Sequence, residues 1–312
     1  MNSSVFDFLL TAAPGAADSA DFAADWARHR ARCADLTNSV DRAAVAGFDG
    51  VALGSAFLGG YQEALHALVP VLAPDELSSM CATEATGARP SAMTTTVAGD
   101  GMVTGTKSFA TLGTFASRFL VIARAGTHSD GKPRLRAVLV AAGPQATVAP
   151  LPPLPFAPEI PHATVTFADA PGETLPGDGY ADYLKPFRTV EDLHVLAAVL
   201  GQLVRVGRQA QWPADALTAL LALFAAVRGL STEPAASAGV HIALAGVFDR
   251  CTALLTELEP HWDRVDQEIR QRWKRDAPLL GVAGKVRAAR LATAWRTVAE
   301  QGAGAPAGHE NH

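Results

Sequence analysis

One acidic stretch of the sequence, toward its C-terminal end, holds several carboxylates. Glu257 and Glu259 are followed by Asp263, Asp266 and Glu268, with arginines interleaved at positions 264, 270 and 272. Paired carboxylates can act as general acid and base, but mixed charges at helical spacing are more typical of a solvated helix face with ion pairs. We therefore expect a charged helix surface here and not a carboxylate active site.

Other residues that could carry chemistry form no general motif. The histidines, including His241 and His261, lack the spacing of metal ligands and are expected at the surface or partly buried. Glycines at positions 99, 101 and 105, and at 302, 304 and 308, lack the GxGxxG spacing of a dinucleotide site. HExxH, CxxC, P-loop and GxSxG patterns do not occur. The sequence therefore predicts no metal site, and general motifs identify no catalytic residue.

Composition restricts the class of protein. With 312 residues, 49% of them hydrophobic, the chain can bury a substantial core. Its formal net charge of -5 gives no basic field, so nucleic acid is not expected as a partner. Three widely spaced cysteines argue against a disulfide framework and for a reducing compartment. We recognise no signal peptide and no apolar stretch long enough to span a membrane, and expect a cytoplasmic protein.

Hydrophobic periodicity divides the first part of the chain into a helical and a β-rich region. Residues 1–81 carry apolar side chains at helical spacing, interrupted by Pro70 and Pro74. In residues 82–180, β-branched residues become frequent and apolar and polar positions alternate, which predicts a small antiparallel β-domain, as a meander or barrel. A glycine-rich turn at 99–101 joins its first two strands, and the proline-rich residues 150–161 should be extended. The expected strands are Met93–Ala98, Met102–Phe109, Arg118–Arg124, Leu135–Val140 and His162–Phe167.

Helical periodicity returns in residues 181–301 and predicts an up-down helical bundle. The expected helices are Phe187–Gln209, Ala214–Arg228, Ala238–Glu259 and Leu279–Gln301, with a charged extension at Asp263–Lys274. These segments carry more apolar surface than one bundle interior needs, so we expect an oligomer formed through them. The glycine-rich residues 302–312 are expected to be disordered. The fold class is α+β, with a β-domain between two helical regions.

The order of elements in MCATEATGARPSAMTTTVAGDGMVTGTKSFATLGTFASRFLVIARAG resembles the middle domain of the flavin-dependent acyl-CoA dehydrogenases. The matching elements are Thr83-Glu84, a threonine-rich strand, a tight turn, Gly105-Thr106-Lys107, Phe109-Ala110-Thr111 and an outward strand. The later segment HATVTFADAPGETLPGDGYADY resembles the last strand of that domain and its link to the family's C-terminal bundle. Together the similarity covers residues 61–209, about half of the chain, and identifies a short, divergent member.

The resemblance implies an FAD-dependent oxidoreductase that acts on the CH–CH bond next to the thioester of an acyl-CoA, with a role in acyl-CoA or fatty acid metabolism. A carboxylate of the family removes the α-proton while a hydride passes to flavin N5. By the same resemblance, Thr83 offers its hydroxyl and amide to the flavin's polar edge, Phe109 packs on the ring system and Thr111 hydrogen-bonds near N5 or O4. Met80 and Ala82 contribute backbone contacts to the cofactor.

This sequence departs from the family pattern at several positions. It has Thr83-Glu84-Ala85 and Gly87-Ala88-Arg89 where the family has Thr-Glu-Pro and Gly-Ser-Asp, and its N-terminal helical region is shorter. The family's arginine that reaches the cofactor diphosphate has no counterpart, since Arg205 and Arg208 lack its local sequence. The family's usual base, a glutamate late in the bundle, is also absent. The glutamates considered for that role are Glu233, Glu257 and Glu259, without support from their local sequence.

Three functions remain open from the sequence. The chain could be an acyl-CoA-oxidising flavoenzyme with a relocated base, in a homo-oligomer. It could instead be a non-catalytic or half-site subunit that pairs with a complete dehydrogenase in a hetero-oligomer. It could also be an interaction scaffold that has lost FAD.

Overall fold

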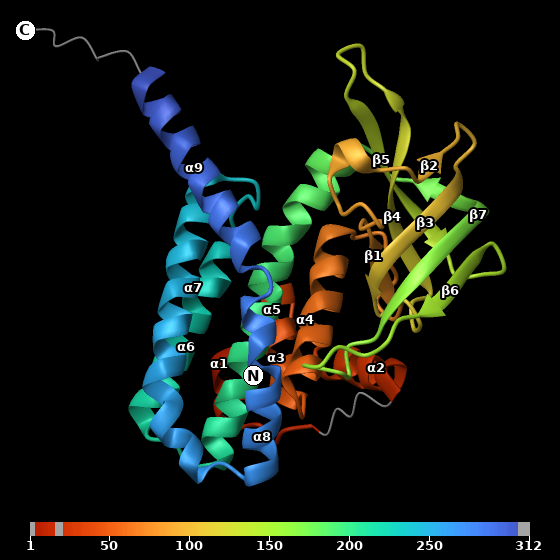
Figure 1. Ribbon diagram of the computed structural model, residues 1–312. Helices are drawn as coiled ribbons and strands as arrows, with labels where there is room; N and C mark the ends of the chain where they lie inside the picture. The colour runs from red at the N-terminus through yellow and green to blue at the C-terminus, as the bar shows by residue number, and fades with distance from the viewer. Residues whose placement is uncertain (1–3, 16–20, 305–312) are drawn as a thin grey trace, which may run out of the picture.

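A helical layer and a β-domain stand side by side in the computed structural model, which describes residues 4–15 and 21–304 (Figure 1). Helices from both ends of the chain form the layer, and the strands come from the middle of the sequence. The predicted α+β class and the order of helical region, β-domain and helical region are confirmed.

The first described elements are four helices in the region that the sequence predicts to be helical. They are α1 (Val5–Thr11), α2 (Phe22–Arg32), α3 (Ser39–Asp49) and α4 (Leu53–Leu68). Ser4, Asp21 and Asn38 precede the first three, and each side chain accepts a hydrogen bond from a backbone N–H of the first turn. Pro70 follows α4 by two residues, in keeping with the inability of proline to continue a helix.

Helix α5 (Lys185–Gln209) joins the two helical regions into one body by packing on α3 and α4. Glycines permit this close approach. A Cβ atom on Gly47 would lie 1.7 Å from the carbonyl oxygen of Ala198, and one on Gly201 would lie 2.0 Å from that of Ala44. Side chains from α1, α3, α5, α6 and α7 belong to one hydrophobic core. The two helical regions that the sequence separates therefore share a single interior.

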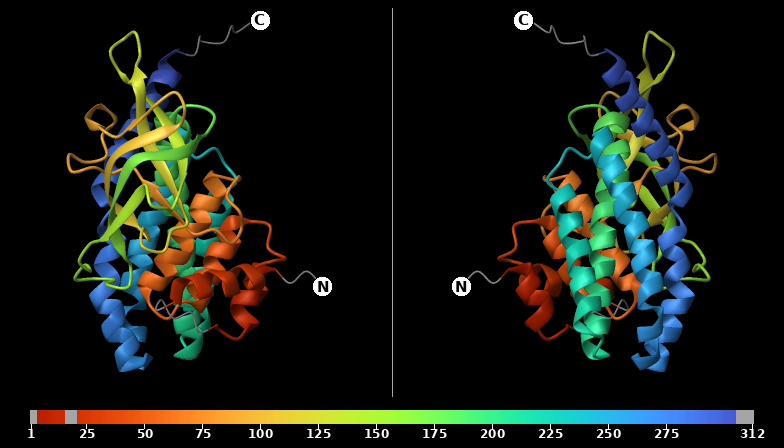
Figure 2. Two further views of the ribbon diagram at one scale, coloured as in Figure 1. Left: turned by 90° about the vertical axis from the view of Figure 1, so that its right-hand side faces the viewer. Right: turned by 90° about the vertical axis from the view of Figure 1, so that its left-hand side faces the viewer.

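The remaining helices complete the bundle around α5. They are α6 (Ala214–Leu230), α7 (Ala238–Leu258), α8 (Gln267–Asp276) and α9 (Gly284–Gly304), with the 3-10 turns η4 (Glu259–Arg264) and η5 (Ala277–Gly281) between them. Helices α5, α6, α7 and α9 lie side by side in the view from the helical side (Figure 2, right). The predicted C-terminal bundle is confirmed, and the charged extension contains a separate helix.

The acidic stretch is a charged helix surface, as the alternating charges indicate. Asp266 caps α8 by accepting hydrogen bonds from two backbone N–H groups. Arg270 pairs with the exposed Asp263 at 2.8 Å, and Arg272 pairs with the exposed Glu268 at 2.6 Å. These pairs stabilise the helix locally and form no carboxylate site.

Helix α9 begins and ends later than predicted, at Gly284 instead of Leu279 and at Gly304 instead of Gln301. It projects beyond the ends of α6 and α7 in Figure 1. The prediction that residues 302–312 are disordered is therefore wrong for the first three of them, and residues 305–312 lie outside the described part of the chain.

One described segment, Ala238–Arg264, is long and apolar enough to cross a membrane by length and composition. The expectation that no such stretch exists is wrong by this criterion. Helix α7 in this segment contributes Leu244, Cys251 and Leu254 to the shared helical core, but only 22% of the apolar window is buried.

The described strands form one seven-stranded sheet. They are β1 (Ser78–Cys81), β2 (Thr96–Val97), β3 (Met102–Thr111), β4 (Arg118–Thr127), β5 (Pro133–Ala141), β6 (Ala146–Pro150) and β7 (His162–Thr174). The pairings close a ring in the order β4, β2, β3, β7, β5 and back to β4, which makes the domain a small barrel. Most pairs are antiparallel, whereas β1 and β2 pair with β4 in parallel.

Two strands were not predicted. Residues 78–81 were expected to end the N-terminal helical region but form β1, so the sheet begins four residues before the expected start of the β-domain at residue 82. Strand β6 lies in a segment with no predicted element and pairs with β7. Both strands are short, and neither carries enough alternating positions to be distinguished from loop.

The apolar run in strand β4 is explained by burial of both of its faces. Phe119 and Val121 point into the barrel interior, where Phe119 meets Phe167 edge-on at 5.9 Å between ring centroids. Leu120 and Ile122 point the other way, into the core between the sheet and the helices. A strand that is buried on both faces has no polar side to alternate with. The sheet is therefore fixed against the helical layer by β4.

Candidate active site

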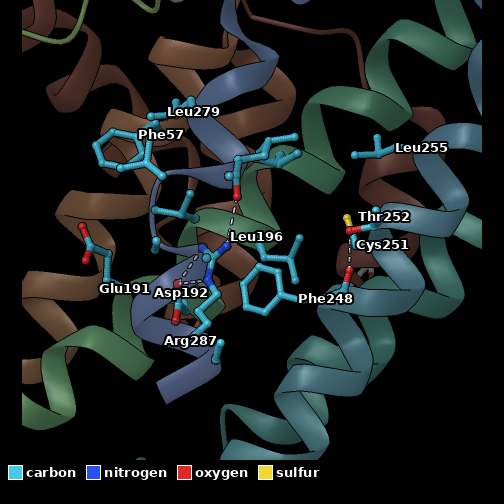
Figure 3. A pocket seen from close by; sticks show the side chains of 18 of the residues that line it. Phe57, Glu191, Asp192, Leu196, Phe248, Cys251, Thr252, Leu255, Leu279 and Arg287 are labelled. Atoms are coloured by element: carbon cyan, nitrogen blue, oxygen red, sulfur yellow. Dashed lines mark hydrogen bonds and ion pairs between the residues drawn. The ribbon is translucent and has the colours of Figure 1, made fainter. Parts of the chain in front are cut away.

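A cavity of about 590 Å³ lies where the helical layer, the β3–β7 edge of the barrel and the loop before β7 meet. Its walls come from α4, residues 154–162, α5, α7, η5 and α9. Figure 3 shows apolar side chains around most of it. These include Phe57, Phe156, Leu196, Phe248 and Leu279. Such a cavity suits a small organic ligand with an aliphatic part.

Glu191 brings a carboxyl group into this apolar cavity from the start of α5. Burial raises its pKa from 4.5 to about 8, and the neighbouring Asp192 raises it further, while Arg287 and Arg188 oppose the shift. A carboxyl group with a pKa near neutrality in a cavity is a candidate general base or acid.

Sequence reasoning missed Glu191, although a signal was present. Glu191 precedes Val195 and Val199 at intervals of four residues, so it lies on the apolar face of α5 that the periodicity identifies. A single carboxylate on an otherwise apolar helix face was the available signal.

Asp192 holds α9 against α5 beside Glu191. Its carboxylate accepts from Arg287 Nε at 2.9 Å and also pairs with Arg290. Arg287 donates to the carbonyl oxygen of Leu280 at 3.0 Å, and its guanidinium carbon lies 3.8 Å from the centroid of the Phe248 ring. Figure 3 shows the Arg287 side chain reaching across the cavity toward Asp192. The guanidinium group is therefore fixed at the cavity wall.

Phe109 connects the predicted cofactor face to this cavity. It lines the cavity, remains 55% exposed and packs on His162 at 5.5 Å between ring centroids. Its φ of 53° places it in the left-handed region, within the register shift between Lys107 and Ala110. A β-bulge turns a side chain out of its alternation, and here the turned side chain is an exposed aromatic ring.

Thr111 and Thr83 flank Phe109 on the same part of the domain. Thr111 pairs with His162 across the β3–β7 ladder, and the carbonyl oxygen of Thr83 accepts from the Ser108 N–H at 2.8 Å. Both threonines are half-buried. Neither hydroxyl makes a hydrogen bond to another residue of the described chain. Neither threonine lines the cavity, although Phe109 does.

Met80 and Ala82 belong to the interior. The Met80 N–H donates to the Tyr61 hydroxyl at 2.8 Å, and the carbonyl oxygen of Ala82 accepts from Lys107 Nζ at 3.4 Å. Both side chains are buried in the core between sheet and helices. Met80 and Ala82 were predicted to make backbone contacts with the cofactor, but the Met80 N–H and the Ala82 carbonyl oxygen are already engaged within the protein.

Two motifs that resemble the acyl-CoA dehydrogenase pattern, Thr83-Glu84 and Gly105-Thr106-Lys107, contain a pair of residues with a structural role. Glu84 and Lys107 form a buried ion pair at 2.8 Å, and Lys107 is fully buried. Glu84 also accepts hydrogen bonds from the N–H groups of Thr94 and Thr95. Although burial opposes it, hydrogen bonding by Lys107 and Thr94 lowers the pKa of Glu84 to about 2. This pair fixes the segment that carries Thr83 to strand β3.

The three glutamates that were candidates for the catalytic base do not line the cavity. Glu233, Glu257 and Glu259 are exposed, and none of them lines it. Glu257 forms a bidentate pair with Arg250 on the surface. Assigning the base to one of these residues is therefore not supported by the geometry.

Arg205 and Arg208 have structural partners. Arg205 donates to the carbonyl oxygens of Asp49 and Gly50, and Arg208 donates to those of Leu9 and Ala12. Both arginines tie α5 to the N-terminal helices. Arg89 is exposed. In the described ranges, no group of His, Cys, Asp and Glu side chains is arranged to hold a metal ion.

No known protein family matches the sequence, and no curated protein matches it either. Solved structures do match the fold. Butyryl-CoA dehydrogenase from Megasphaera elsdenii is 18% identical with a TM-score of 0.63, over 84% of each chain. The prolyl acyl carrier protein oxidase AnaB is 15% identical with a TM-score of 0.63, over 93% of this chain and 96% of its own.

The FAD complex of PigA also matches, with 13% identity and a TM-score of 0.63 over 82% of this chain and 81% of that one. The fold implied by the sequence resemblance is thereby confirmed at low identity. This chain has the acyl-CoA dehydrogenase fold, in a strongly divergent sequence.

Proposed function

We propose that the chain is a flavin-dependent oxidoreductase that oxidises the CH–CH bond next to the carbonyl of an acyl thioester. The observation that carries the proposal is the apolar cavity that contains both Glu191, with its raised pKa, and the exposed ring of Phe109. The aromatic ring and the free hydroxyls of Thr83 and Thr111 suit a flat, polar-edged ring system such as FAD. PigA, which has the same fold, is described as an FAD complex.

In this proposal Glu191 removes the α-proton of the bound acyl group. The apolar cavity destabilises the carboxylate, which makes Glu191 a stronger base than an exposed glutamate. Removing such a base slows proton transfer by about 10²- to 10⁴-fold. A bound flavin would supply the acceptor for the β-hydride. Phe109 and Thr111 position that acceptor at the edge of the cavity.

The test separates cofactor binding from catalysis. FAD titration followed by visible absorbance and flavin fluorescence measures binding, and anaerobic bleaching by butyryl-CoA measures reduction of the flavin. We expect wild type to bind FAD and bleach, and Glu191→Gln to bind FAD with at least about a hundredfold slower bleaching. Glu233→Gln, which changes an exposed glutamate outside the cavity, is the matched control. The proposal would be refuted if the protein is colourless after incubation with excess FAD and removal of the unbound cofactor.

A second candidate is a half-site subunit that shares its cofactor with a related, complete dehydrogenase. The engagement of Arg205 and Arg208 in structural contacts favours it, since neither is free to reach a cofactor diphosphate. A partner copy or a related chain would then supply that cation, through an oligomer built on the C-terminal helices. Light scattering with and without FAD distinguishes the cases: a flavin-saturated homodimer argues against the half-site subunit.

A further inference from the structure

Arg287 is a cation on the wall of an otherwise apolar cavity. Its Nε and one terminal nitrogen engage Asp192 at 2.9 and 2.8 Å, and the other terminal nitrogen donates to Leu280 at 3.0 Å. A guanidinium group has five N–H donors, so these contacts leave two unassigned. The stacked Phe248 ring and the ion pair fix its orientation before any ligand arrives.

The charges around Arg287 do not balance. Asp192 is one carboxylate shared by the two guanidinium groups of Arg287 and Arg290. Glu191 forms no ion pair with Arg287 or Arg290 in the described part of the chain, and its raised pKa reduces its negative charge. Asp249 also lines the cavity but is exposed, so solvent screens its charge. The cavity wall therefore carries an excess positive charge that an anion can offset.

We propose that the cavity binds short aliphatic carboxylates, with the carboxylate on the free donors of Arg287 and the chain against Leu196, Phe248 and Phe57. Guanidinium and carboxylate groups form charge-assisted, oriented hydrogen bonds, which makes arginine suited to this ligand. The binding site itself does not require flavin. Its role in turnover rests on the proposed function: there, Arg287 selects an acyl group that ends in a second carboxylate.

Calorimetric titration of the full chain without flavin tests the site with two probes of nearly equal shape, hexanoate and hexanamide. Hexanoate should bind at least about tenfold more tightly than hexanamide at pH 7. Arg287→Gln should remove this preference, and Arg287→Lys should keep part of it because the charge remains. Arg290→Gln is the matched control, since Arg290 shares Asp192 but does not line the cavity. It removes part of the excess charge but none of the free donors of Arg287, so it should weaken the preference less than Arg287→Gln does.

Equal binding of the two probes to wild type, or no binding of either, would overturn the proposal without any variant. Loss of the preference in Arg290→Gln to the same extent as in Arg287→Gln would also overturn it, because the effect would then be one of general charge. These results are independent of the proposed oxidoreductase. FAD binding and bleaching by butyryl-CoA can succeed while hexanoate fails, and the reverse can also occur.

Discussion

Replacing Glu191 with glutamine removes a carboxyl group that the folded protein keeps in an unfavourable environment. In the unfolded chain its pKa is near 4.5, and in the folded protein burial raises it to about 8. Below pH 4.5 both states hold the proton and Glu191 costs nothing. As pH rises from 4.5 to 8, only the unfolded chain releases the proton freely, so the folded state loses stability. Above pH 8 the penalty is constant.

One pKa unit corresponds to about 1.4 kcal/mol, so the full shift sets an upper limit of about 5 kcal/mol, and about 3 kcal/mol at pH 7. Glu191 is only half-buried, so solvent screening reduces this penalty. We expect about 2 kcal/mol at pH 8 in place of the upper limit. We therefore expect Glu191→Gln to be more stable than wild type by about 2 kcal/mol at pH 8, with little difference at pH 4.5.

Urea unfolding followed by circular dichroism at pH 4.5, 6, 7 and 8 measures the difference, with Glu233→Gln as the control for an exposed glutamate. The gain in Glu191→Gln should grow with pH, and the control should show no such trend. A pH-independent difference, or a variant less stable than wild type at pH 8, would refute the reasoning that burial raises the pKa of Glu191.

Three further results are expected. Lys107→Met should lower the free energy of unfolding by about 3–5 kcal/mol, because it leaves Glu84 charged and buried without its partner. Adding Glu84→Gln should recover much of this loss. Urea unfolding that shows no recovery in the double variant would contradict the pairing. Asp192→Asn should raise hydrogen exchange of α9 by about tenfold, since the arginines of α9 lose their shared carboxylate, and unchanged protection would show that packing alone holds the helix. Phe109→Ala should weaken FAD binding more than Thr111→Ala, because aromatic contact area contributes several kcal/mol and one neutral hydrogen bond about 1 kcal/mol. Fluorescence titration measures the affinity. Equal affinity in wild type and both variants would exclude a cofactor role for Phe109 and Thr111.

The sequence determined the order of the elements because period and composition are local properties. The alternation in Met102–Thr111 and the buried run around Phe119 specify strands β3 and β4, and the apolar face of α5 specifies a helix. The motif around Phe109 identified the fold, and the structural matches confirmed it. These inferences need only neighbouring residues.

The sequence did not reveal the cavity, because its walls come from segments more than a hundred residues apart. Phe57, Phe109, Glu191 and Arg287 come to line one cavity only when α5 packs on α4, and α9 packs on α7 and pairs with Asp192 of α5. The charge state of Glu191 also follows from this packing, since desolvation depends on what surrounds a carboxyl group and not on its position in the chain.

The motif residues divide in the same way. The sequence treats Glu84, Lys107 and Met80 as parts of one pattern around a cofactor. Tertiary structure assigns Glu84 and Lys107 to a buried ion pair and Met80 to the core, and leaves Phe109 exposed at the cavity. The physical reason is that local sequence sets backbone conformation and alternation. Only the packing of the barrel against the helical layer decides which of these side chains reaches a ligand.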